Sequence, residues 1–195
     1  MEIKRVALVI FDIGGYTDFI RYNRETLGHA HEVISQLLET IVDKAEHPLV
    51  LNKFEGDAAF LYAESKGNEA ALVEDVSRQV FDLFPAFRSK ALALSQQRSM
   101  CPCGACQSIG NLRLKAITHL GDAAFRKIRN FEEIAGEDVI VIHRLLKNAV
   151  ESREYVLTTM PYFSAMPAAL KPQGRLHSET YDVIGKLDLR VFDAG

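Results

Sequence analysis

The stretch that decides the fold is Ile10–Phe19, IFDIGGYTDF, which ends an apolar run that begins at Val6. The run Val6–Phe11 contains no polar residue, so it predicts a fully buried strand. Asp12 then interrupts the run, and a buried carboxylate costs several kcal/mol unless another group pairs with its charge. Two interpretations follow. One is a strand end with a turn and a helix cap, and the other is a metal ligand with a phosphate-binding turn behind it.

The composition limits the classes of protein to which the chain can belong. With 195 residues, 48% of them hydrophobic and 25% charged, it is typical of one globular domain spanning residues 1–195. A net charge of -3 forces no basic face and argues against a nucleic-acid partner. No apolar run approaches the ~18–20 residues that cross a bilayer, and no cleavage site follows the first apolar run. We therefore expect no membrane segment and a cytoplasmic location.

Hydrophobic spacing along the chain predicts short strands separated by long helices. The expected strands are 6–11, 49–54, 58–62, 112–119, 123–131, 155–159, 180–184 and 187–192. The expected helical regions are 17–45, with a break at Gly28, followed by 68–96 and 136–149. The order β-α-β-β-α-β is typical of an α+β, ferredoxin-like core, a mostly antiparallel sheet with helices on one face. The last strands predict a C-terminal extension of that core.

Two acidic residues stand at strand ends that such a core would bring together. Asp12 closes the first strand, and Asp57 opens the strand that follows a hairpin at Glu55–Gly56. Two adjacent carboxylates repel each other, and a divalent cation that prefers oxygen ligands, such as Mg²⁺ or Mn²⁺, relieves that repulsion. The pair Gly14–Gly15, between a strand and a helix, lets the backbone approach an anion closely. Together these features indicate two-metal chemistry at a phosphorus centre.

Segments in order along almost the whole chain resemble the signatures of class III adenylate/guanylate cyclase catalytic domains. Residues 10–17, IFDIGGYT, are similar to the family's F-x-D-I-x-G-[FY]-T signature, and Lys53–Asp57 resembles its K-x-x-G-D hairpin. Thr118–Gly121 is similar to its H-x-G strand end, and Gly136–Leu145 to its G-x-x-V-N-x-A-x-R-[LM] helix. Gly185–Lys186 stands where the family has a lysine-bearing turn. The chain is therefore interpreted as a divergent cyclase-homology domain.

The resemblance implies a metal and substrate site as well as a fold. Asp12 and Asp57, helped by the Ile13 carbonyl, would bind two Mg²⁺ or Mn²⁺ ions. The turn formed by Gly14, Gly15 and Tyr16 would contact the nucleotide. One ion would activate the ribose 3′-hydroxyl for attack on the α-phosphate, and the other would hold the leaving pyrophosphate.

The resemblance also implies how the base and the phosphates are recognised. Lys53 and Glu133 fall where the family reads the base, and this pair suits the ring nitrogen and exocyclic amine of adenine, which favours ATP. Arg144 would stabilise phosphate charge in the transition state. Family sites form at a dimer interface, so the resemblance implies a homodimer. If Glu55–Gly56 is a two-residue turn, Lys53 and Asp57 leave opposite faces of the hairpin, which also favours a site shared by two chains.

One departure from the family separates the functional hypotheses. Ile140 replaces the asparagine that orients the ribose, and isoleucine offers no hydrogen bond there. The first hypothesis is a cyclase that converts ATP to cyclic AMP and pyrophosphate by two-metal catalysis at a homodimer interface. The alternative is a catalytically impaired cyclase homology domain that binds nucleotide or metal, or serves as a dimerisation module.

Each candidate residue also has a purely structural interpretation. Asp12 would accept hydrogen bonds from the Gly14–Gly15 amides at the strand end. Lys53 and Glu133 would be solvent-facing surface residues. Arg144 would form an ion pair with Glu137 or Asp138 across turns of its own helix.

All three cysteines lie in an insert at about 98–110, which has no counterpart in the cyclase motifs. Cys101, Cys103 and Cys106 form a C-x-C-x-x-C cluster, and an odd number of cysteines is a poor disulfide framework. The cluster supplies three of the four ligands of a zinc site. It is therefore either a second metal site or a reduced, exposed loop. His29 stands near a helix start and carries no metal pattern of its own.

Overall fold

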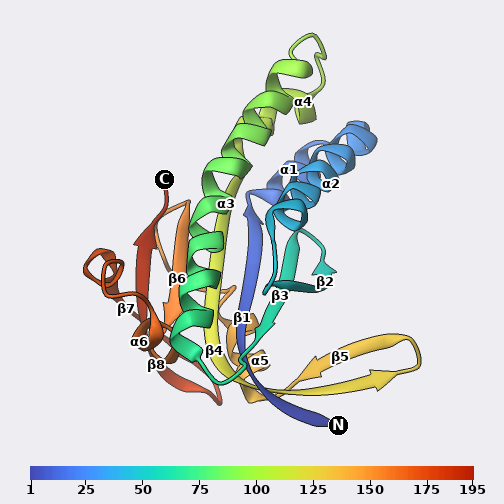
Figure 1. Ribbon diagram of the computed structural model, residues 1–195. Coiled ribbons are helices and arrows are strands. Elements are labelled where there is room, and N and C mark those ends of the chain that lie inside the picture. The colour runs from blue at the N-terminus through green and yellow to red at the C-terminus, as the bar shows by residue number, and fades with distance from the viewer.

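One eight-stranded sheet organises the chain, and the computed structural model describes all of residues 1–195 (Figure 1). The strands are β1 (Glu2–Gly14), β2 (Val50–Glu55), β3 (Ala58–Glu64), β4 (Arg113–Ile128), β5 (Phe131–Ala135), β6 (Tyr155–Thr159), β7 (Arg175–Tyr181) and β8 (Gly185–Asp193). They lie in the order β2-β3-β1-β4-β6-β8-β7, and β5 pairs with β4 outside that path. All paired strands are antiparallel except β4 and β6, which are parallel.

Helices connect these strands and pack on the sheet. The α-helices are α1 (Tyr16–Tyr22), α2 (Leu27–Lys44), α3 (Glu69–Gln97), α4 (Gly104–Ser108), α5 (Glu137–Arg144) and α6 (Met160–Ala165). Short 3₁₀ segments are η1 (Arg24–Thr26), η2 (Ile109–Asn111) and η3 (Lys171–Gln173). None of the helices combines the length and the apolar character that a membrane span requires.

The first four strands have the ferredoxin-like arrangement expected from the sequence. β1 is central, with β3 and β4 on either side of it and β2 beyond β3, which gives the order β4-β1-β3-β2. The chain after α5 adds β6, β8 and β7 beyond β4. The predictions of an α+β ferredoxin-like core and of a C-terminal strand extension are both confirmed.

β1 is buried on both faces, and this explains its uninterrupted apolar run. Its alternate residues divide between two hydrophobic clusters. Val9 and Phe11 belong to the larger cluster with residues of α2 and α3, whereas Leu8 and Ile10 belong to the smaller cluster with residues of α5. Helices therefore cover both faces of the sheet. The expectation of helices on one face holds for α2 and α3 of the core, whereas α5, which follows the long β4–β5 hairpin, packs on the opposite face.

Two element boundaries differ from the expected ones for local reasons. The first helical region breaks at Asn23, whose side chain donates a 2.7 Å hydrogen bond to a main-chain carbonyl of α1. Gly28, the expected break, lies inside α2. The strand expected at 123–131 is wrong, since β4 continues to Ile128. The chain reverses only at Arg129, whose φ of 56° is the left-handed conformation found in tight turns.

The β2–β3 hairpin turns one residue later than the sequence suggested. Glu55 pairs with Ala58, so Gly56 and Asp57 form the two-residue turn. The φ of 68° at Gly56 is a conformation that glycine adopts without a steric penalty. Asp57 therefore lies in the turn, outside the strand ladder, rather than at the start of β3.

A β-bulge in β2 decides which way Lys53 points. The register shifts between Leu51 and Lys53, so that Lys53 pairs with Phe60. Cross-strand partners share a face of the sheet, and Phe60 belongs to the smaller cluster on the α5 side. Asp12 pairs with Ala58 of the same cluster, so Lys53 and Asp12 share one face. Asp57 lies in the turn and interacts with Asp12, so the inference that alternation along a strand sends Lys53 and Asp57 to opposite faces is wrong.

The cysteine-containing segment joins the ends of two long helices. In Figure 1 the C-terminal end of α3 and the short α4 reach beyond the sheet and lie beside α1 and α2. Asn23, at the end of α1, lies 3.5 Å from the Ser108 hydroxyl of α4. Gly104 permits this approach, because a Cβ there would lie 2.5 Å from the Asn23 side-chain oxygen.

Candidate functional site

Asp12 and Asp57 lie beside each other at the end of β1. Asp12 pairs with Ala58 of β3 on one side and with Lys115 of β4 on the other. Asp57 precedes Ala58 in the turn, and its main-chain carbonyl accepts a 3.2 Å hydrogen bond from the Ile13 amide. The structure thus brings together all three residues that the sequence predicted as metal ligands.

Lys115 is a member of this site that sequence reasoning missed. Its Nζ lies 2.7 Å from Asp12 Oδ2, and the two side chains are 23% and 15% exposed. Burial lowers the pKa of Lys115, but the hydrogen bond and the charge of Asp12 outweigh burial, and the pKa is raised. The antiparallel register of β1 and β4 places the two residues opposite each other, and a long-range register leaves no local signal in the sequence.

The pKa of Asp57 is raised by burial and by repulsion from the neighbouring carboxylate of Asp12. Burial, and after it the negative charge of Asp12, raise the pKa of Asp57 from 3.8 to about 6, while Lys115 opposes them. A divalent cation relieves this kind of repulsion. The carboxylates of Asp12 and Asp57 and the main-chain carbonyl of Ile13 are oxygen donors, and a set of oxygen donors fits Mg²⁺ or Mn²⁺.

Lys115, the partner of Asp12, also lines a cavity of about 220 Å³, whose wall includes neither carboxylate. Its wall contains the predicted phosphate-binding turn, Gly14–Gly15, and two arginines, Arg113 and Arg153, in addition to the lysine just described. α1 has only seven residues, so its dipole adds little, and these three cations are the main attraction for an anion. Tyr16, the third residue of the predicted turn, begins α1 and packs against the larger hydrophobic cluster.

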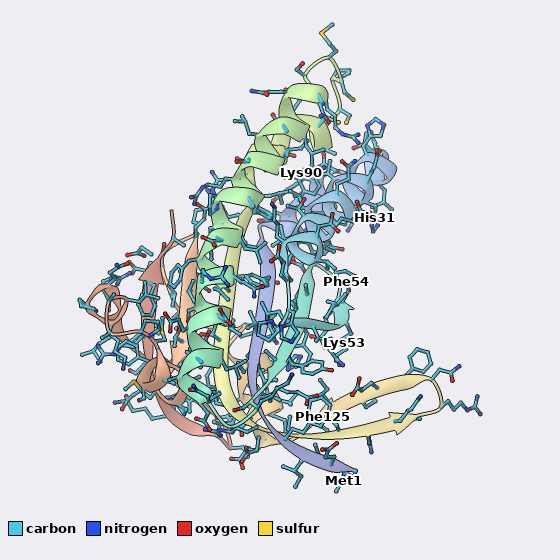
Figure 2. The ribbon with its side chains drawn as sticks, viewed as in Figure 1. Met1, His31, Lys53, Phe54, Lys90 and Phe125 are labelled. Carbon is cyan, nitrogen blue, oxygen red and sulfur yellow. The ribbon has the colours of Figure 1, made fainter.

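The residues predicted to read the base lie at the edge of the sheet. Lys53 and Phe54 project from β2 at this edge (Figure 2). Lys53 Nζ lies 3.1 Å from Glu55 Oε1, and Glu55 also contacts His143 of α5 at 3.0 Å. Glu133 lies on β5, a strand that approaches β2. Within one chain, Lys53 therefore pairs with Glu55 rather than with Glu133.

Arg144 is exposed at the end of α5, away from the carboxylates. It lines a cavity of about 350 Å³ with Ile140 and Lys147, and none of the carboxylate-site residues lines this cavity. Ile140 is 55% exposed. Arg144 forms no ion pair with Glu137 or with Asp138, which is held by another partner.

A buried polar network fastens α5 to the sheet. His119 contacts Asp138 through Nε2 and Thr159 through Nδ1, both at 2.8 Å. The Asp122 amide donates to the second oxygen of Asp138 at 2.6 Å. A Cβ on Gly121 would collide with the Asp138 side chain, so this glycine is required by close packing. Burial lowers the pKa of His119, against the opposing effect of Asp138, and the network has a structural role.

His29 completes the cysteine cluster, and sequence reasoning missed it. From the first turn of α2, its Nδ1 lies 3.4 Å from Cys103 Sγ, 3.6 Å from Cys101 Sγ and 3.7 Å from Cys106 Sγ. The four ligand atoms all lie within 4.8 Å of one another. The Cys106 amide, which donates to the Cys103 sulfur, lowers the pKa of Cys103 to about 6. Burial raises the pKa of Cys106 to about 11.

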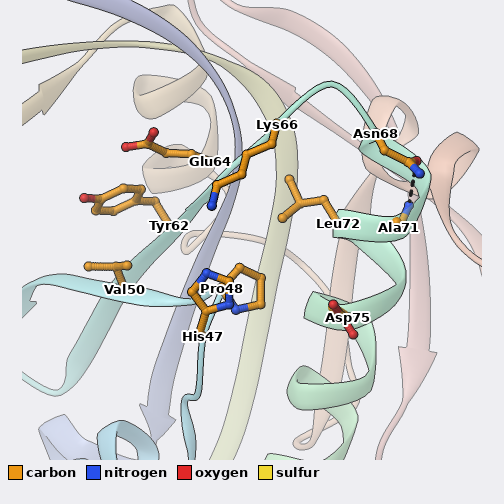
Figure 3. A pocket seen from close by; sticks show the side chains of 10 residues that line it. All are labelled: His47, Pro48, Val50, Tyr62, Glu64, Lys66, Asn68, Ala71, Leu72 and Asp75. Atoms are coloured by element: carbon orange, nitrogen blue, oxygen red, sulfur yellow. Dashed lines mark hydrogen bonds between the residues drawn. The ribbon is translucent and has the colours of Figure 1, made fainter.

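A further cavity, of about 430 Å³, lies between the β2–β3 strands and the start of α3 (Figure 3). Side chains from both sides line it, among them His47, Tyr62 and Asp75. Asn68 at its edge caps α3 by accepting a 3.1 Å hydrogen bond from the Ala71 amide. None of the residues predicted from the sequence lies in this cavity, so the carboxylate pair is the candidate site.

The chain has the fold of class III nucleotidyl cyclase domains. The adenylyl cyclase CyaB from Pseudomonas aeruginosa has a TM-score of 0.59 and 17% identity, covering 98% of this chain and 95% of that chain. The guanylyl cyclase Cya2 has a TM-score of 0.67 and 11% identity, over 100% and 94% of the two chains. A class III adenylyl cyclase-like ATP-binding protein from Pseudomonas aeruginosa has a TM-score of 0.64 and 14% identity, over 88% of this chain and 36% of that chain.

Within this fold, the chain belongs to the protein family described as "Protein of unknown function (DUF2652)", whose model matches residues 34–155. The uncharacterized protein Rv2561/Rv2562 of Mycobacterium tuberculosis is 32% identical over 160 residues, which cover 82% of this chain and 73% of that protein. The residues that the family model matches include the β2–β3 turn, Lys115 and all three cysteines.

Proposed function

We propose that this protein binds a nucleoside triphosphate together with two Mg²⁺ or Mn²⁺ ions at the site formed by Asp12 and Asp57. One observation carries the proposal. These carboxylates meet at the end of β1, and Lys115, the partner of Asp12, also lines a cavity with a glycine turn and two arginines. A triphosphate needs cations on both sides, and this site offers protein cations on one side and ligands for metal cations on the other.

The chain's own residues have distinct roles in this proposal. Asp12, Asp57 and the Ile13 carbonyl would hold the metal ions, which when bound stabilise charge on the phosphates. Lys115 contacts Oδ2 of Asp12, so it balances the charge of this carboxylate while no metal ion is bound and competes with the ion for it. Asp57 ionises above a pKa of about 6, so its carboxylate is available to cations at neutral pH.

We place the complete site at the interface of a two-fold homodimer. By the family resemblance, Lys53, Glu133 and Arg144 of one chain would face Asp12 and Asp57 of the other. In a single chain neither Lys53 nor Arg144 contacts either carboxylate, so one chain alone does not assemble this set. The Lys53 and Glu133 pair favours ATP, since the two side chains complement adenine.

Conversion of ATP to cyclic AMP and pyrophosphate is the second candidate function of the same site. In that reaction the ribose 3′-oxygen attacks the α-phosphorus, the bond to pyrophosphate breaks, and the hydroxyl proton passes to solvent. The carboxylate pair favours this chemistry, but Ile140 cannot hydrogen-bond the ribose. Substrate positioning contributes much of the rate of phosphoryl transfer. We therefore assign the chain as a catalytically impaired homology domain, which binds nucleotide and metal but turns the nucleotide over slowly. The class III cyclase-like protein of the same fold that is described as ATP-binding is consistent with this assignment.

Calorimetric titration at pH 7.5 tests the binding proposal. Mn²⁺ with a non-hydrolysable ATP analogue should bind wild type, and Asp12→Asn and Asp57→Asn should each weaken binding at least about tenfold by removing one charged ligand. Asp82→Asn is the matched control, because Asp82 is exposed on α3 and should leave affinity unchanged. Equal affinity for wild type and both site variants would overturn the assignment.

Light scattering tests the dimer separately. In the presence of Mn²⁺ and the analogue, the expected mass is twice the 21.8 kDa of one chain. If the protein is a monomer at every concentration and still binds nucleotide, the proposals of a shared site and of the cyclase reaction are refuted. The proposal of metal and nucleotide binding would stand.

A further inference from the structure

We propose that His29, Cys101, Cys103 and Cys106 bind one Zn²⁺ ion that fastens the ends of α2 and α3 to each other. This site is independent of the proposed nucleotide site. Three of its ligands come from the cysteine-containing segment after α3, and the fourth comes from the first turn of α2, more than seventy residues earlier. Each of the four offers one ligand atom to a common centre.

Four distances within the cluster are close to those of tetrahedral coordination. Zn–S bonds of about 2.3 Å and a Zn–N bond of about 2.0 Å place two sulfurs about 3.8 Å apart and a nitrogen about 3.5 Å from each sulfur. The three distances from His29 Nδ1 to sulfur are 3.4, 3.6 and 3.7 Å. Cys101 Sγ and Cys103 Sγ are 3.4 Å apart, so an ion at the centre requires only a small outward shift of these sulfurs.

The donor set selects zinc over the cations proposed for the carboxylate site. Three sulfurs and one imidazole nitrogen form a closed set of the structural type, with no position left for substrate. Mg²⁺ and Mn²⁺ prefer oxygen ligands and would bind this set poorly. Three thiolates around a divalent ion leave one net negative charge. Arg98, 18% exposed and paired with Glu32, lies close enough to Cys106 to interact with its thiolate.

The surrounding contacts show what the ion would hold in place. The Cys106 amide donates to the Cys103 sulfur at 3.5 Å, and Gln107 donates to the Cys101 carbonyl at 2.9 Å, so the segment already folds around its sulfurs. Ala105 and Ile109 of the segment are buried in the larger hydrophobic cluster, and the free energy of metal binding would add to these contacts. Zinc would therefore stabilise the junction of α2, α3 and α4 rather than take part in catalysis.

Cobalt substitution in the full-length, reduced, chelator-treated protein tests the site directly. Co²⁺ should bind at one equivalent and give the thiolate charge-transfer and tetrahedral absorption of a sulfur-rich site, and Zn²⁺ should abolish both signals. Cys103→Ser should lose the signal, and His29→Ala should bind at least about tenfold more weakly. His31→Ala is the matched control, because His31 is exposed two residues further along α2 (Figure 2), and should bind like wild type.

A thiol count keeps the proposal testable if a variant fails to fold. In wild type, Zn²⁺ should protect all three cysteines from a thiol reagent, and chelation should expose them. Absence of metal-dependent absorbance in reduced wild type would overturn the site. Unchanged affinity in folded His29→Ala would overturn the assignment of the fourth ligand.

Discussion

Replacing Asp57 with asparagine should stabilise the metal-free protein at neutral pH. Burial and the charge of Asp12 raise the pKa of Asp57 in the folded chain from 3.8 to about 6. The folded state therefore keeps this proton over a range in which the unfolded chain has already released it, and stability falls as pH rises from about 4 to about 6. Above pH 6 the folded protein bears the full cost of the ionised carboxylate. Asparagine has the same shape and removes that cost.

The size of the effect follows from the same pKa. A rise from 3.8 to about 6 corresponds to about 3 kcal/mol at 1.36 kcal/mol per pH unit. Asp57 is only half-buried, so screening by solvent reduces the expected gain to about 1.5 kcal/mol. For a chain of this length, that gain raises the Tm by about 3–6 °C. At pH 4.5, where only the unfolded chain is largely ionised, about a third of the gain should remain.

Thermal unfolding followed by circular dichroism, with a chelator present, measures this difference at pH 7.5 and 4.5. Asp82→Asn serves as the control for losing a surface charge. Added Mn²⁺ should raise the Tm of wild type and leave that of Asp57→Asn unchanged, which reverses the order of the two proteins. Equal Tm values for wild type and Asp57→Asn at pH 7.5 would refute the reasoning, because they would show that ionised Asp57 does not destabilise the folded chain.

Three further substitutions probe the same face of the sheet. Lys115→Met should destabilise the metal-free protein by about 2 kcal/mol, because it leaves Asp12 without its partner. It should nevertheless raise Mn²⁺ affinity in calorimetry, and a loss of stability without that gain would contradict the role given to Lys115. Gly121→Ala should lower stability in urea unfolding by about 2 kcal/mol, since a Cβ would collide with Asp138, and wild-type stability would show that the packing can adjust. Ile140→Asn should raise the yield of labelled cyclic AMP at least about tenfold with little change in Tm, because Ile140 is 55% exposed. Rapid turnover by wild type and slower turnover by this variant would contradict the alignment of α5 with the family helix.

Local pattern was sufficient for much of the fold. The strand expected at 155–159 is β6, residue for residue, and Asn68 caps α3 where the second long helix was expected to start. The composition of 155–159 predicts the strand, and the capping residue Asn68 predicts the start of the helix. The position of α5 on the opposite face could not be read in this way, because it depends on where the β4–β5 hairpin ends. A glycine such as Gly121 is typical of a turn, but Gly121 lies within the long strand β4, where close packing against Asp138 requires it.

Some residues of the candidate site were also predicted from local pattern, whereas others were found only in the folded structure. Asp12 and Asp57 were expected to meet, because both stand at strand ends that the ferredoxin-like order makes neighbours. Lys115 and His29 were not found, since each joins its partners only through tertiary packing. The direction of Lys53 was misjudged for two reasons. The turn was placed at Glu55–Gly56 rather than at Gly56–Asp57, and the bulge between Leu51 and Lys53 was not foreseen. Small errors in register change the face on which a side chain lies, and only the assembled sheet corrects them.

The bulge between Leu51 and Lys53 has a consequence for how copies of this protein can associate. β2 is the outermost strand of the sheet at its end, and an outer strand with free amides and carbonyls can recruit strands from other molecules into open-ended aggregates. A bulge interrupts that row of free groups, and the exposed charge of Lys53 discourages a second strand from docking there. Self-association by adding strand to strand is thereby disfavoured at this margin. A two-fold assembly would instead bury broad faces of the molecule, which closes after two copies and leaves no growing end.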